Sequence, residues 1–108
     1  MENILLAKQR REHIRWLVLR HLNRERPAAL SDTDLVTFIR AEYPDVTMVQ
    51  LHKELDYLRL RGLLLITETF PHWHLRLTYQ GVDMVEYNTA EVTGIGRPAV
   101  ALYAEETT

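Results

Sequence analysis

The spacing of apolar side chains predicts a helix at the start of the chain. Over residues 4–24 the apolar stripe of this helix consists of Ile14, Leu17, Val18 and Leu22. Trp16 lies off that stripe, and Asn3 is the expected N-cap. Because Pro27 cannot continue a helix, we expect this one to end near Glu25.

Capping residues mark the beginning of two more predicted helices. Ser31 is a suitable N-cap for a second helix, which the sequence Tyr43-Pro44-Asp45 ends. The apolar side of this helix consists of Leu35, Phe38 and Ile39. Thr47 and Gln50 have the spacing of a capping box, so the third helix is predicted to begin at about Met48.

The third helix has one clearly apolar face. Leu51, Leu55 and Leu58 recur at helical spacing, and Gly62 is the expected left-handed residue at the C-terminal end. At about 100° per residue, the side opposite the leucines can be assigned from the sequence. It carries Val49, Lys53, Asp56 and Leu60, with Tyr57 beside them.

After the third helix the apolar period changes from that of a helix to that of a strand. Residues 63–69 are rich in aliphatic and β-branched side chains and predict one strand. Residues 70–73 predict a turn, and residues 74–78 predict a second strand with Leu75 and Leu77 on one face. We therefore expect the two strands to form a hairpin.

A last helix and a tail complete the predicted order. Thr78 is a suitable N-cap for a helix that ends near Asn88, with Val82, Met84 and Val85 as its apolar residues. Residues 89–108 have no clear period, and we expect them to form an edge strand or to be partly disordered.

Composition indicates a single globular domain. The chain has 108 residues, of which 46% are hydrophobic and 26% charged, and it has no cysteine. Disulfides and thiolate metal sites are therefore excluded, and a reducing cytoplasm is the expected location. The first apolar run is too short for a signal peptide, and no segment has the length of a membrane span, so we expect no membrane partner.

The charges are unevenly distributed along the chain. Residues 1–26 hold seven basic and three acidic residues, whereas residues 82–108 hold one basic and five acidic residues. This polarity suggests an anionic partner at one end or head-to-tail association of two chains. The simpler explanation is that water solvates both ends.

Two motifs follow one another along the chain. The first is Leu51-x-x-x-Leu55-x-x-Leu58-x-x-x-Gly62-Leu63-Leu64, and the second is Leu75-x-Leu77-Thr78-x-x-Gly81. They resemble the third helix with its following strand, and the second wing strand with its following helix, of winged helix-turn-helix regulators of the ArsR and MarR types. The resemblance covers about residues 10–88 and extends to small winged-helix proteins of Mu-like phages and prophages.

The resemblance implies an α+β fold in one domain over residues 1–88. This fold has a three-helix core, a two-stranded β-hairpin wing and a C-terminal helix. The implied function is binding of double-stranded DNA, by a protein that we expect to be a homodimeric transcriptional regulator. The expected DNA contacts are Thr47, Met48, Gln50, His52 and Lys53, flanked by Tyr57 and Arg59, with Arg76 on the wing.

A winged-helix module that binds protein without binding DNA is the alternative interpretation. Asp56 would repel phosphate, and the tip of the wing carries aromatic residues where basic residues are usual in the families that it resembles. The alternative protein interface consists of Val49, Asp56, Leu60, Phe70 and Trp73. The motif residues themselves build the scaffold, and a fold does not by itself determine a function.

Catalytic and metal-binding patterns are weak in this sequence. His72-x-His74 places two imidazoles on one side of a strand, but a zinc site needs further ligands. Gly94-x-Gly96 does not join a strand to a helix, so it is not a dinucleotide loop. We expect no enzyme activity, no cofactor and no metal. A metal- or proton-responsive switch at the two histidines is the third alternative.

Overall fold

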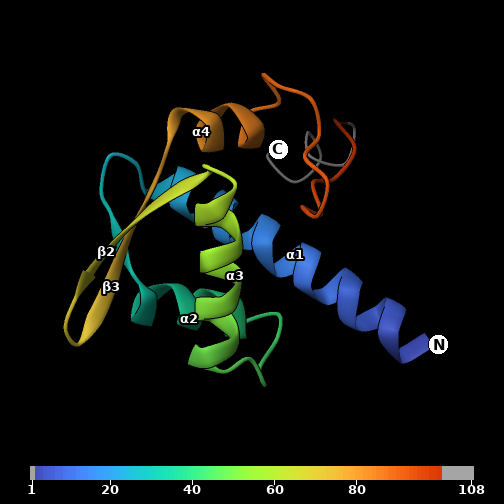
Figure 1. Cartoon of the computed structure of the whole chain (residues 1–108), viewed down its shortest axis with the longest axis horizontal. Helices are drawn as coiled ribbons and strands as arrows, with labels where there is room; N and C mark the ends of the chain where they lie inside the picture. The colour runs from blue at the N-terminus through green and yellow to red at the C-terminus, as the bar shows by residue number, and fades with distance from the viewer. Residues whose placement is uncertain (1, 101–108) are drawn as a thin grey trace.

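The computed structural model describes residues 2–100, which adopt an α+β fold with four helices and a three-stranded antiparallel sheet (Figure 1). The helices are α1 (Glu2–Glu25), α2 (Asp32–Arg40), α3 (Met48–Leu60) and α4 (Tyr79–Val85). The strands are β1 (Leu30–Ser31), β2 (Leu64–Thr69) and β3 (His72–Leu77). The helices enclose one apolar core together with the inner face of the sheet.

The sheet has one strand more than the sequence predicts. Its order is β1-β3-β2, and Leu30 pairs with Leu75 while Ser31 pairs with His74. The predicted hairpin forms from β2 and β3, but the third strand, β1, was not predicted, because a two-residue strand is too short to show alternation in the sequence. The turn predicted for residues 70–73 was also too long, since β3 begins at His72.

Helix α1 crosses the molecule and packs against α2, α3, α4 and β3 (Figure 1). It ends at Glu25 as predicted, but it begins at Glu2, so Asn3 lies inside the helix and is not its N-cap. Trp16 is fully buried although it lies off the predicted stripe. The stripe was too narrow because neighbours surround the middle of α1, whereas residues 3–9 are exposed.

The caps of α2 and α3 form as predicted. The Ser31 hydroxyl accepts a hydrogen bond from the Asp34 amide, and Thr47 and Gln50 form both bonds of the capping box. The three leucines of the third-helix motif are fully buried. On α2, however, Val36 is buried and the predicted core residue Phe38 is partly exposed.

The two sequence motifs meet at the junction between α3, β2 and α4. The Thr78 hydroxyl donates to the Gly62 carbonyl at 2.6 Å and accepts from the Gly81 amide at 3.1 Å, which caps α4 as predicted. Gly62 has a left-handed φ of +74°. Gly81 lies so close to the residue that precedes β2 that a Cβ atom there would overlap the carbonyl oxygen of Leu63. Both glycines are therefore required by the path of the backbone.

The segment after α4 packs on α1. Helix α4 ends at Val85, earlier than the predicted Asn88. Ile95 is buried in the core, and the Gly96 amide donates to the Glu12 carbonyl at 2.9 Å. Residues 89–100 contain no strand, and the rest of the expected edge strand, residues 101–108, lies outside the described residues. Within residues 2–100 no helix combines the length and apolar composition needed to cross a bilayer.

Replacing Gly81 with Ala is expected to lower the free energy of unfolding by about 3 kcal/mol, because the backbone carbonyl that meets the new methyl group cannot move aside alone. Gly62→Ala is the matched control. A Cβ atom at position 62 would meet open space, so this substitution adds only the strain of a left-handed φ. We expect it to lower the free energy of unfolding by about 1 kcal/mol. Urea unfolding followed by circular dichroism measures both. Equal losses would contradict the close approach of α4 to Leu63.

Candidate functional site

Helix α3 exposes the face that lies opposite its leucines. Val49 and Leu60 are among the most exposed large hydrophobic residues of the described chain, and Lys53 is exposed between them. Glu54, by contrast, lies toward α1 and is buried. The predicted orientation of α3 is therefore confirmed, and the outward face carries the mixture of apolar and charged residues that the sequence indicates.

Two acidic residues of α3 are neutralised by arginines. Asp56 accepts hydrogen bonds from Nε and Nη2 of Arg59 at 3.2 and 3.1 Å on the surface. Glu54 accepts a buried hydrogen bond from Nε of Arg15 at 2.7 Å. Among the described residues Lys53 has no ion pair. The net effect leaves one uncompensated positive charge at the centre of the outward face.

The capping box occupies part of the predicted contact surface at the start of α3. Oε1 of Gln50 accepts from the Thr47 amide, and the Thr47 hydroxyl accepts from the Gln50 amide, both at 3.1 Å. Gln50 is exposed, so its side-chain NH2 group still faces solvent. Met48 is half-buried and packs against the core.

Tyr57 lies on the flank of α3 and not on its outward face. Its ring is stacked between the guanidinium groups of Arg15 and Arg61, at 3.4 and 3.5 Å from the ring centroid. Its hydroxyl donates to the Thr93 carbonyl at 3.5 Å, and a Cβ on Gly94 would overlap that hydroxyl. Tyr57 therefore anchors the C-terminal segment to α3, a role that no local pattern indicates.

A cleft of about 250 Å³ runs between the N-terminal half of α1 and α3. We call it the α1–α3 cleft. Its polar and charged lining consists of Arg10, Arg11, Gln50, Lys53 and Glu54. Ala7 and Ile14 are its apolar lining. The cleft brings two predicted contact residues of α3 beside two arginines of α1, which the sequence analysis had not grouped with them.

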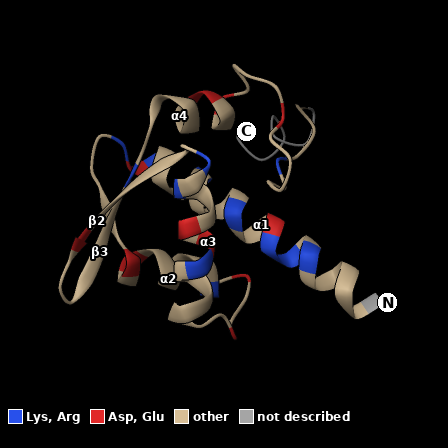
Figure 2. Cartoon of the chain, viewed as in Figure 1, with Lys and Arg blue, Asp and Glu red and all other residues tan. Residues whose placement is uncertain are grey.

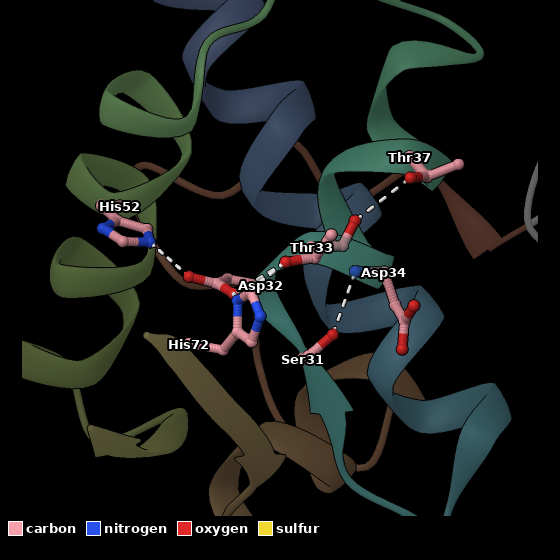
Figure 3. A network of polar contacts seen from close by, with 7 residues as sticks. All are labelled: Ser31, Asp32, Thr33, Asp34, Thr37, His52 and His72. Carbon is pink, nitrogen blue, oxygen red and sulfur yellow. Dashed lines mark hydrogen bonds and ion pairs between the residues drawn. The ribbon is translucent and has the colours of Figure 1, made fainter. Parts of the chain in front are cut away.

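The other flank of α3 contacts the hairpin through Asp32. Nε2 of His52 donates to Oδ2 of Asp32 at 2.7 Å, and Nδ1 of His72 lies 3.6 Å from Oδ1 (Figure 3). Nδ1 of His72 also lies 3.0 Å from the Thr33 hydroxyl. The His52 ring stacks on Trp73, with ring centroids 3.8 Å apart. These five residues, the Asp32 cluster, join α2, α3 and β3.

The two aromatic residues predicted at the tip of the hairpin have different environments. Trp73 is half-buried against α3, whereas Phe70 is almost completely exposed. His52, expected to contact DNA, uses its ring for Asp32 and Trp73. The sequence offered no signal for the Asp32 cluster, because its members are up to 41 positions apart and have no shared period.

The carboxylate of Asp32 is ionised and strongly bonded. Its side chain is only 4% exposed. Burial by itself raises the pKa of Asp32, but the hydrogen bonds from His52 and from the backbone of Trp73 outweigh that effect and hold the pKa below its ordinary value. Its position in the first turn of α2 adds a favourable interaction with the helix dipole.

Arg76 and His74 lie on the face of the sheet opposite Trp73, Leu75 and Leu77. They line a surface hollow of about 500 Å³ together with Leu65, Thr67 and Thr69. His72 contacts Asp32 and Thr33 at the edge of the sheet, whereas His74 lines this hollow. Within residues 2–100 no group of three or more histidine or carboxylate side chains is arranged to hold a metal ion.

Comparison with known proteins gives no match. Neither family models, nor curated proteins, nor solved structures yield a protein similar to this chain.

Asp32→Asn is expected to lower the free energy of unfolding by about 1.5–3 kcal/mol at neutral pH, because it removes a buried, charge-assisted hydrogen bond. A depressed folded-state pKa means that the carboxylate stabilises the fold fully above its ordinary pKa of 3.8. That stabilisation is lost as the pH falls through the lower folded-state pKa. The difference between wild type and variant should therefore shrink below about pH 4.

Asp34→Asn is the matched control on the same helical turn, because Asp34 is exposed. It should change stability by about 0.5 kcal/mol or less. Chemical denaturation from neutral pH to below about pH 4 measures the free energy of unfolding of wild type and of both variants. A loss for Asp32→Asn that is small at neutral pH, or equally large at every pH, would contradict the role assigned to Asp32.

Proposed function

We propose that this chain is a winged-helix protein that binds double-stranded DNA, with α3 as the recognition helix and the β2–β3 hairpin as the wing. Two sets of observations support the proposal: the two motifs lie in the order that the resemblance requires, and they meet at one junction. Action as a homodimeric transcriptional regulator is the biological role that we infer with it.

The charge balance of α3 carries the proposal. Asp56 was the strongest argument against DNA, because an acidic residue facing the groove repels phosphate. The ion pair with Arg59 offsets the negative charge of Asp56. The ion pair with Arg15 likewise offsets the negative charge of Glu54. Lys53 is left as an exposed cation between them. The outward face is thus compatible with a polyanion.

The dimensions of α3 suit the major groove. Its 13 residues span about 20 Å, and the groove is about 12 Å wide, which admits one helix with its side chains. Lys53 and the side-chain NH2 group of Gln50 are hydrogen-bond donors for base edges or phosphates, and Val49 suits a thymine methyl group. Tyr57 and Arg76 lie elsewhere and play no part in this proposal.

Lys53→Gln is expected to weaken binding of a pooled random-sequence duplex by about tenfold at low salt, because it removes the central cation of the proposed recognition helix. Arg24→Gln, which removes an exposed cation from the C-terminal end of α1, far from the cleft, is the matched control and should bind like wild type. Fluorescence anisotropy titrations at several salt concentrations measure the affinities. If the wild-type protein fails to bind, or its affinity does not depend on salt, the DNA-binding proposal is wrong.

Binding of a protein partner is the second candidate function. It is favoured by three exposed apolar side chains, two on α3 and one at the tip of the wing: Val49 is 67% exposed, Leu60 74% and Phe70 98%. Aromatic residues such as Phe70 are enriched in the buried centres of protein interfaces. Trp73 does not belong to this set, since it packs on His52.

If the wing binds protein, Phe70→Ala should abolish capture of a specific partner while leaving DNA affinity and stability unchanged, because Phe70 is outside the core. Leu65→Ala, an exposed apolar residue on the other face of the sheet, is the matched control. Affinity purification with quantitative mass spectrometry compares the two variants with wild type. Equal partner sets for all three proteins would exclude a protein-binding role for Phe70.

A further inference from the structure

We infer that α1, and not the wing, supplies the cation that holds the DNA backbone, with Arg11 in the α1–α3 cleft as the phosphate contact. This inference rests on the DNA-binding function proposed above and assigns its backbone contact. It makes the N-terminal half of α1 part of the DNA interface, a role that neither the fold nor the sequence motifs assign to it.

The two flanks of α3 differ in what they face. His52 lies on one flank and contacts Asp32 and Trp73 beside the wing. Gln50 and Glu54 lie on the other flank and line the cleft with α1. A helix in the major groove, with a diameter of about 10–12 Å in a groove about 12 Å wide, has a phosphate backbone close to each flank. One backbone therefore passes beside the wing and the other beside α1.

The wing offers almost no positive charge to the DNA phosphate backbone that would pass beside it. Its only basic residue is Arg76, which lies on the face of the sheet that points away from α3. Glu68 adds a negative charge near the tip, and Phe70 and Pro71 form the turn. Figure 2 shows the contrast, with basic residues along α1 and an acidic residue on β2. The cationic flank of α3 is thus the α1 side.

Ion pairs within the protein single out Arg11 among the charges of the cleft. Glu54 is neutralised by Arg15, at 2.7 Å. Arg10 is neutralised by Asp45, at 2.8 Å. Arg11 is exposed and, within the described residues, has no ion pair, so its charge and that of Lys53 are available to an anion.

Arg10 has a different task, which fixes the geometry of the cleft. It donates to Asp45 in the loop before α3 and lies over the Tyr43 ring, 4.9 Å from its centroid. Both partners belong to the connection between α2 and α3. Arg10 is therefore a positioning residue that holds the start of α3 against α1, and Arg11 on the next position faces the cleft.

The experiment is the salt dependence of DNA binding by full-length variants. Each phosphate contact contributes about 0.9 to the slope of log K against log salt concentration. Arg11→Gln should make the slope shallower by about 0.9 for a pooled random-sequence duplex. With equal affinities extrapolated to 1 M salt, this change corresponds to about eightfold weaker binding at 0.1 M.

Two variants separate charge from structure. Arg24→Gln removes the same charge from an exposed position 13 residues further along α1, about 20 Å from Arg11, and should leave the slope unchanged. Arg11→Lys keeps the charge and should retain the wild-type slope. Thermal unfolding by circular dichroism checks that every variant is folded, and the exposure of Arg11 predicts unchanged midpoints.

The outcomes distinguish this inference from the function on which it rests. If wild type binds DNA and Arg11→Gln leaves the salt slope unchanged, the role assigned to α1 is wrong. The proposed DNA-binding function would still hold. Equal losses for Arg11→Gln and Arg24→Gln would also overturn the role of α1, because they would show a general effect of net charge. Absence of salt-dependent binding by wild type would overturn both.

Discussion

Burial of the leucine face of α3 against α1 is the constraint on which the rest of the structure depends. Leu51, Leu55 and Leu58 have no exposed surface, and the middle of α1 beneath them is buried on all sides. Because these side chains lie on one side of a helix, the opposite side has to face solvent. The same packing places one flank of α3 beside the arginines of α1 and the other beside the hairpin.

Local signals in the sequence were sufficient for most of the elements. Caps such as Thr47 and Thr78 form hydrogen bonds within four residues, so their spacing alone identifies the helix starts. Gly62 ends α3 for the same local reason. The pair Asp56–Arg59 could also have been predicted from its spacing of three residues, whereas Asp56 was interpreted as a charge that repels phosphate or as part of a protein interface.

Interactions between distant residues account for what the sequence did not predict. Arg15 and Glu54 are 39 positions apart, and His52 and Asp32 are 20 apart. No periodicity links such residues, since only the tertiary fold brings them together. They nevertheless decide the chemistry of the candidate site, because they neutralise Glu54 and engage His52, one of the expected DNA contacts. The sequence was therefore sufficient to place and orient α3, but not to show which of its polar side chains are engaged within the protein.

The central claim is that the outward face of α3 and the adjacent part of α1 form one DNA-binding surface. Amide chemical-shift mapping of the full-length, isotope-labelled protein against duplex DNA tests it most directly. The account predicts shifts concentrated at residues 47–60 of α3 and at Arg10 and Arg11 of α1, with little change at residues 64–77. Shifts confined to the hairpin tip, or no shifts at low salt, would contradict it.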